Sequence, residues 1–135
     1  MLPAEIVHAY IEDVFNAHDI DAADRYIEAD FVSNNPQVGD GLKGFKDYFS
    51  TILEAFPDLW GTVEDTIVEG SKVVVRMTWR GTHRGELLGL APTGRTVAYK
   101  AIDIYRLDGD KIAEHWDVAD ALTLLQQLGV VGDSG

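Results

Sequence analysis

The spacing of apolar side chains changes near residue 60, and this change limits the possible folds more than any other feature. From residue 5 to residue 56 they recur at every third or fourth position, which is typical of helices with one buried face. From residue 62 they alternate with polar side chains, which is typical of strands. Helices followed by consecutive strands predict an α+β domain, with the helices packed on an antiparallel or mixed sheet.

The chain of 135 residues has the length of one domain, so we treat residues 1–135 as a single domain. In the first half, the pattern predicts helices over 3–15, 21–27 and 45–56 and a short extended piece over 31–35. Pro57 is expected to end the last of these helices, because proline cannot continue the backbone hydrogen bonding.

The second half is predicted to contain four strands joined by tight turns. Gly70-Ser71 and Asp108-Gly109-Asp110 are the turn signals. Asp120 is placed to cap a final helix that ends at Gly129, and residues 130–135 are predicted to form a flexible tail. The predicted strands span 62–69, 72–80, 96–107 and 111–118.

Charged residues indicate which face of each strand lies outside, because successive side chains point to opposite faces. Arg76, Lys100, Arg106 and Glu114 mark the outer face of three strands. The residues of opposite parity, which are predicted to point toward the helices, are Val73, Val75, Met77 and Trp79, then Ala101, Asp103 and Tyr105, then Ala113, His115 and Asp117.

Two carboxyl groups and one imidazole therefore share the face that the helices cover. Such groups cost free energy there unless they are paired or in contact with water, so Asp103, His115 and Asp117 predict a polar pocket. Two structural alternatives stay open. A β-bulge would shift the parity and expose His115 and Asp117, or either carboxyl could form an ion pair with an arginine across the sheet.

The outer face of the sheet is predicted to carry Trp116 beside Arg76 and Arg106. Tryptophan and arginine are enriched at protein interfaces, so this face is predicted to form a homodimer. Alternatively, Trp116 stacks on an arginine and shields it.

The formal net charge is −12, and the first 70 residues hold 15 acidic and 3 basic side chains. Without a basic stripe, binding to nucleic acid or to an anionic membrane surface is not expected. The absence of cysteine excludes disulfides, zinc–thiolate sites and a thiol nucleophile. Residues 1–5 do not resemble a signal peptide and no apolar run is long enough to span a membrane, so the expected localisation is cytoplasmic.

Several segments, in the same order along the chain, resemble those of one known family. They are Phe15–Asp19, Phe56–Leu59, Gly81–Arg95, Asp103–Arg106, Asp108–Ile112, Glu114–Val118 and Leu124–Gly129. Over residues 5–129 the chain resembles the SnoaL-like polyketide cyclases, a branch of the NTF2-like superfamily. One difference is that many relatives carry His-Asn-Pro where this chain has Asn34-Asn35-Pro36.

The resemblance implies a cone-shaped α+β barrel that is usually dimeric and has a deep cavity for a hydrophobic small molecule. It also implies that the reaction in this cavity needs neither a cofactor nor a metal. Well-known members close the last ring of an aromatic polyketide by an intramolecular aldol condensation. In them an acidic residue on the last strands removes a proton from an activated carbon and returns one to the aldol oxygen, and Asp117 matches that residue. The other polar pocket groups that the resemblance implies are His83, Asp103, His115, Asn34 and Asn35.

The chemistry of these residue types allows a specific catalytic or binding role for each, and each also has a purely structural alternative. Asp117 could act as a base if burial and the Asp103 carboxyl raise its pKa toward neutrality; otherwise it is a salt-bridge partner at a strand end. Asp103 is a neutral hydrogen-bond donor, a second base, or one member of an ion pair. His115 is a pocket donor or a satisfied, half-buried histidine.

His83 lies among glycines, so it is predicted to be a mobile donor at the cavity mouth, with an exposed loop histidine as the alternative. Asn34 and Asn35 are predicted to orient a substrate carbonyl, although Asn before Pro is also common in turns. The predicted apolar lining consists of Trp60, Met77, Trp79 and Tyr105, whereas Tyr10 and Tyr48 are predicted to belong to the core.

The sequence bears on three other kinds of function besides a cyclase. A metal site would have to use His83, His115 and Asp117, but no surrounding residues support one, so no metal is expected. Epoxide hydrolases of the limonene type place Arg and Asp two residues apart on a strand. Here the strand arginine Arg76 is followed at that spacing by Thr78, so the pattern of such a hydrolase is missing. A ketosteroid-isomerase-like proton transfer and a non-catalytic ligand-binding protein stay open as alternatives.

Overall fold

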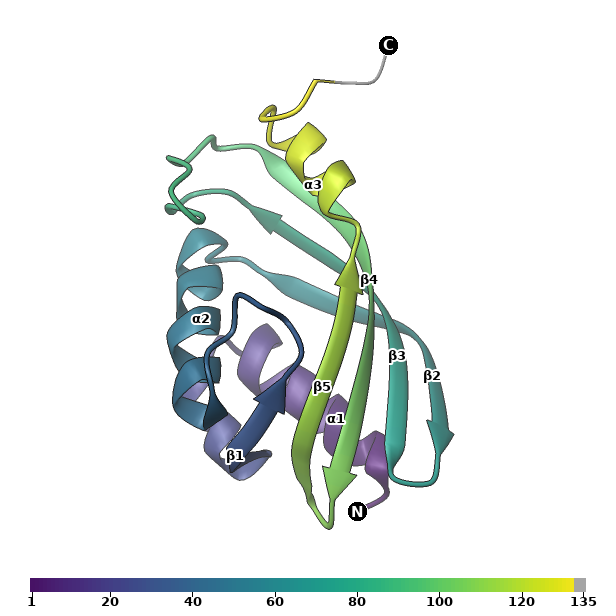
Figure 1. Cartoon of the computed structure of the whole chain (residues 1–135). Helices are drawn as coiled ribbons and strands as arrows, with labels where there is room; N and C mark the ends of the chain where they lie inside the picture. The colour runs from purple at the N-terminus through teal and green to yellow at the C-terminus, as the bar shows by residue number, and fades with distance from the viewer. Residues whose placement is uncertain (133–135) are drawn as a thin grey trace.

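Five strands form one curved, open sheet, and the helices of the first half cover its concave face (Figure 1). The computed structural model describes residues 1–132. The spatial order is β1-β5-β4-β3-β2; β1 runs parallel to β5, and the other neighbouring strands are antiparallel. The strands are β1 (Ile27–Ser33), β2 (Trp60–Glu69), β3 (Lys72–Thr82), β4 (Thr96–Asp108) and β5 (Lys111–Ala119). The α-helices are α1 (Pro3–Tyr10), α2 (Gly41–Ala55) and α3 (Ala121–Gln127), and together these elements confirm the predicted α+β class.

The helical half departs from the sequence pattern in two places. α1 continues directly into a π-helical segment, Ile11–Asn16, so the predicted first helix is present but widens toward its end. The short helix predicted over 21–27 is present as a 3₁₀ helix, Ile20–Arg25, but it ends two residues earlier than predicted and Ile27 begins β1. The cause is a distant strand: the backbone N–H of Ile112 in β5 donates to the Tyr26 carbonyl at 2.7 Å and holds this segment at the sheet.

Aromatic side chains fill the space between the helices and the sheet. The ring of Tyr10, the last residue of α1, lies 5.6 Å from those of Phe15 and Tyr105 and 6.1 Å from that of Phe45 in α2. Phe45 is fully buried, and burying one such side chain stabilises the fold by about 1.5–3 kcal/mol. The apolar stripe of the helices therefore packs against the concave face of the sheet, as the periodicity predicts.

The two faces of the sheet are sorted as the charged residues indicate. Val73, Val75 and Met77 point inward and are buried, whereas Arg76 points outward and pairs with Asp65 of β2 at 2.6 Å. A register irregularity occurs between Arg106 and Leu107, yet the inward parity of the central rows is kept. The inward orientation predicted for this face is confirmed.

The C-terminal helix is capped as expected. The Asp120 carboxylate accepts hydrogen bonds from the Thr123 backbone N–H at 3.1 Å and from its hydroxyl at 2.6 Å. The predicted tail over 130–135 falls partly outside the described residues, and within them the N–H of Val130 donates to the carbonyl of Leu125. Over residues 1–132, no helix combines the length and the apolar character that crossing a membrane requires.

Candidate functional site

Two adjacent strands bring four polar residues together on the concave face. β4 supplies Asp103 and Tyr105, and β5 supplies His115 and Asp117. Asp103 is directly opposite Asp117, and Tyr105 is directly opposite His115. Because side chains on one face of a strand recur every second residue, the four form a block of two rows on one surface.

The main interaction in this block is diagonal. Nε2 of His115 lies 2.8 Å from Oδ1 of Asp103, and the two residues are 5% and 7% exposed. The second carboxyl oxygen of Asp103, Oδ2, is buried and has no hydrogen-bond partner among residues 1–132. Burial raises the pKa of Asp103, the hydrogen bond and charge of His115 lower it, and the Asp117 charge raises it; the net direction is upward.

Tyrosine side chains enclose the pair. The ring of Tyr105 stacks on the imidazole of His115 with a centroid distance of 4.7 Å and an interplanar angle of 15°. Burial raises the pKa of Tyr10 and Tyr105 well above the usual range and raises the pKa of Tyr99 to about 12. These three hydroxyls therefore stay protonated and can donate hydrogen bonds at any physiological pH.

Asp117 is less buried than Asp103 and lies nearer the open side of the block. Its Oδ2 accepts a long hydrogen bond from the Asn35 amide at 3.5 Å. One donor or acceptor atom each from Asp103, His115 and Asp117 lies within 4.8 Å of the others, so this set could hold a divalent cation. A cation bound through Nε2 of His115 would first have to break the bond from that atom to Asp103.

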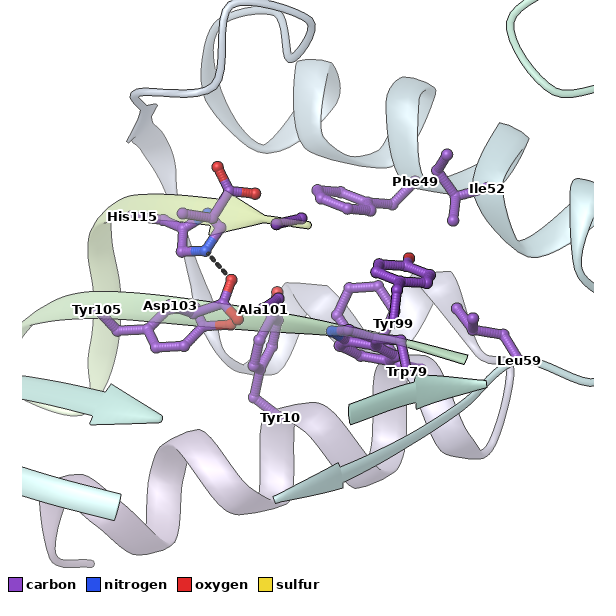
Figure 2. Close-up of a pocket in the computed structure, with 13 residues that line it drawn as sticks. Tyr10, Phe49, Ile52, Leu59, Trp79, Tyr99, Ala101, Asp103, Tyr105 and His115 are labelled. Carbon is purple, nitrogen blue, oxygen red and sulfur yellow. Dashed lines mark hydrogen bonds and ion pairs between the residues drawn. The ribbon is translucent and has the colours of Figure 1, made fainter. Parts of the chain in front are cut away.

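A pocket opens between α2, the π-helical segment and the sheet, and the polar block forms its inner end (Figure 2). Its walls are apolar or aromatic, which suits a hydrophobic ligand with a few polar atoms. The lining residues are Tyr10, Phe15, Phe49, Ile52, Leu59, Trp79, Tyr99, Ala101, Asp103, Tyr105, His115, Asp117 and Ala119.

Five of the ten residues that the sequence singled out line this pocket, namely Trp79, Asp103, Tyr105, His115 and Asp117. Asn35 is not part of the lining, but its side-chain amide donates a hydrogen bond to the lining residue Asp117. The cross-sheet ion pair with arginine, one of the open alternatives, is replaced by the contact between Asp103 and His115.

The other four predicted site residues lie outside the pocket lining. His83 is fully buried beside Phe56, and its Nδ1 accepts the Thr93 backbone N–H at 3.2 Å, so it supports the loop instead of reaching over the cavity mouth. Met77 is buried in the core, and Trp60 is 50% exposed outside the pocket lining. Asn34 points to the outer side, where its amide donates to Glu114 at 3.1 Å.

Sequence reasoning missed Tyr10 and Tyr99 as pocket residues, together with the helix residues Phe49 and Ile52. Tyr10 belongs to the apolar stripe of α1, and periodicity alone does not distinguish a core face from a pocket wall. Tyr99 shares the inward parity of Asp103 along β4, and this was the signal that could have found it.

The fold and the site define a class: an α+β protein whose aromatic pocket ends in a carboxyl–imidazole pair and a second, more accessible carboxyl. Such a set can remove a proton from a carbon acid and return it, and can donate hydrogen bonds to an oxygen that gains charge.

Comparison with known proteins shows which family within this class the chain resembles. The family model for SnoaL-like polyketide cyclases matches residues 5–128. Nogalonic acid methyl ester cyclase from Streptomyces nogalater is 30% identical over 121 residues, covering 85% of this chain and 89% of the relative. This chain belongs to the SnoaL-like polyketide cyclase family.

Solved structures share this fold. TsrD from Streptomyces laurentii superposes with a TM-score of 0.87 at 30% identity, covering 95% of both chains. AclR from Streptomyces galilaeus, provisionally assigned as a hydroxylase, superposes with a TM-score of 0.85 at 29% identity, covering 99% of this chain and 87% of AclR. The fold thus also occurs in a protein assigned to a different reaction, so the reaction has to be argued from the site.

Proposed function

We propose that this protein is a cofactor-independent cyclase that closes a ring in a keto-ester-type small molecule by intramolecular aldol condensation. The observation that carries the proposal is the position of Asp117, the more accessible of two neighbouring carboxyls, at the polar end of an aromatic pocket. The relative from Streptomyces nogalater, named as a methyl ester cyclase, supports the same reaction class.

In the proposed reaction Asp117 acts as general base and then as general acid. Its carboxylate takes a proton from the carbon between two carbonyl groups, and the electron pair of the broken C–H bond moves into an enolate. The enolate carbon attacks a second carbonyl carbon of the same molecule, which forms the C–C bond and places negative charge on that carbonyl oxygen. Asp117 returns its proton to this oxygen, so the product is an isomer of the substrate.

The neighbours of Asp117 prepare it for this role. Asn35 holds one of its oxygens, and the aromatic walls exclude water and fix the flat parts of the substrate. The Asp103 carboxyl lies directly opposite Asp117, and burial raises the pKa of Asp103, which favours the protonated form of that carboxyl.

The direct test is turnover of nogalonic acid methyl ester and then of a panel of linear aromatic keto esters. The products are separated by liquid chromatography and their masses are measured by mass spectrometry. We expect a product of unchanged mass and altered retention, lost in Asp117→Asn and kept in Asp110→Asn, a change at the exposed turn between β4 and β5. Products that form equally fast with Asp117→Asn would contradict the proposal.

We also propose that the outer face of the sheet binds a second copy of this chain. Ile102 of β4 and Val118 of β5 are directly opposite each other on this face, and both are open to solvent: Ile102 is 50% exposed and Val118 is 78% exposed. Beside them the Lys72 ammonium lies 5.4 Å from the ring centre of Trp116, and Arg106 pairs with Glu114 at 3.2 Å. The local pairing of Arg106 with Glu114 limits repulsion between two identical faces, which supports a symmetric dimer.

A further inference from the structure

The carboxyl oxygen Oδ2 of Asp103 is a buried polar atom without a partner at the inner end of the pocket. Asp103 is 7% exposed, and no group among residues 1–132 hydrogen bonds with Oδ2. An unsatisfied buried polar group destabilises the folded state, so folded proteins rarely keep one that has no use. Asp103 belongs to the pocket lining, so a ligand that moves the side chains covering Oδ2 could supply the missing partner.

The geometry also shows where a proton on Asp103 would be. Oδ1 lies 2.8 Å from Nε2 of His115, and with a proton on Nε2 the imidazole donates to Oδ1. A proton on the carboxyl then belongs on Oδ2. Burial raises the pKa of Asp103, which favours this neutral form, and in that form Oδ2–H is a donor without an acceptor among residues 1–132.

The Tyr10 hydroxyl is a second donor at the same place. Tyr10 rises from the end of α1 toward Asp103, and both residues line the pocket (Figure 2). Its ring is held by edge contacts with Phe15 and Tyr105, each at 5.6 Å between centroids. Burial and the charge of Asp103 raise its pKa, so the hydroxyl keeps its proton.

We propose that Oδ2–H of Asp103 and the hydroxyl of Tyr10 form a donor pair that binds the enolate oxygen of the substrate while Asp117 holds the abstracted proton. This inference rests on the proposed function and deepens it: the substrate must present a carbonyl oxygen to the donors and its acidic C–H to Asp117. Two carboxyls on directly opposite residues thereby take different roles, one ionised and one neutral. His115 is the positioning residue that holds Asp103.

The role of Asp103 can be separated from that of a second base by comparing Asp103→Asn with Asp103→Val. The amide of Asn can accept from His115 with its oxygen and still present an N–H donor to the substrate. We expect deuterium exchange at the acidic carbon of β-keto esters to fall about tenfold in Asp103→Asn and about 10²–10³-fold in Asp103→Val. Equal losses in the two variants would show that the anionic form is needed and would overturn the proposal.

The Tyr10 hydroxyl is tested without turnover by binding of 2-naphthol, whose oxygen mimics the enolate, followed by its fluorescence. We expect Tyr10→Phe to weaken binding about tenfold or more, and Asp117→Asn to strengthen it because a nearby negative charge is removed. Tyr26→Phe is the matched control, since its hydroxyl donates to Asp13 outside the pocket.

Different results would contradict the cyclase proposal and the donor pair. If Asp117→Asn leaves carbon-acid exchange unchanged, the proposed function is wrong. If exchange depends on Asp117 but 2-naphthol binds equally well to the wild type, Tyr10→Phe and Asp103→Val, the donor pair is wrong and the cyclase proposal stands.

Discussion

His115 and Asp103 are joined diagonally across β4 and β5, with Nε2 and Oδ1 2.8 Å apart and both side chains buried. The residues directly opposite them, Tyr105 and Asp117, are thereby left with other tasks: Tyr105 stacks on the imidazole, and Asp117 faces the pocket. The four neighbouring side chains therefore differ in role. Asp103 and His115 bind each other, the Tyr105 ring packs on His115, and the Asp117 carboxyl is accessible from the pocket.

The raised pKa of Asp103 makes stability depend on pH in a definite direction. In the unfolded chain this carboxyl loses its proton near 3.8, whereas the folded state keeps it to a higher pH. Within that window the folded state binds more protons, so the free energy of unfolding falls as pH rises. Urea unfolding of wild type and Asp103→Asn between pH 4 and 8 should show the wild type losing stability relative to the variant; parallel curves would contradict this.

Asn35 and Asn34 provide a matched pair, because adjacent amides point to opposite sides of the sheet. Asn35 contacts Asp117, whereas Asn34 donates to Glu114 on the outer face. We expect Asn35→Ala to slow Asp117-dependent exchange about 3- to 10-fold, the usual range for one weak hydrogen bond of about 0.5–1.5 kcal/mol. Asn34→Ala should leave the rate within about twofold, and equal effects on the rate would refute the assignment.

Gly85 holds the loop after β3 against the end of α2. A Cβ on Gly85 would lie 2.4 Å from the carbonyl oxygen of Glu54, and that oxygen belongs to backbone and cannot rotate away. The N–H groups of Arg84 and Gly85 also both donate to the Ala55 carbonyl. We expect Gly85→Ala to lower the free energy of unfolding by about 2–4 kcal/mol. Gly132→Ala, where a Cβ meets open space, should change it by less than about 0.5 kcal/mol in the same denaturation assay.

The dimer proposal predicts a mass of twice 14.9 kDa by light scattering after size exclusion. Ile102→Lys would bring like charges together at the centre of the outer face, and we expect it to raise the dissociation constant about 30-fold or more. Leu122→Lys, an equally exposed apolar residue on α3, is the control. A wild type that stays monomeric at hundreds of micromolar would rule the dimer out.

Much of this site could be predicted from the sequence, because strand alternation is a local rule. The charges of Arg106 and Glu114 marked the outer face, and the inward placement of Asp103, His115 and Asp117 followed. The same rule could not place the loop histidine His83, whose burial depends on packing against Phe56, a contact between distant parts of the chain.

Two further features depended on tertiary structure. The segment after Arg25 enters the sheet because Ile112 binds the Tyr26 carbonyl, which no local pattern reports. Tyr10 was assigned to the core because a pocket wall and a core face share one helical stripe, and only the position of Asp103 beside it reveals the difference.

Proton–deuterium exchange at the acidic carbon of β-keto esters, followed by NMR in wild type and Asp117→Asn, tests the proposed chemistry most directly. We predict enzyme-catalysed exchange that falls by about 10²–10⁴-fold in the variant, the contribution expected of one general base. Exchange that is equally fast in both proteins would show that Asp117 is not the base. Absence of exchange in the wild type, with the same esters shifting the resonances of pocket residues, would instead identify a protein that binds these molecules without acting on them.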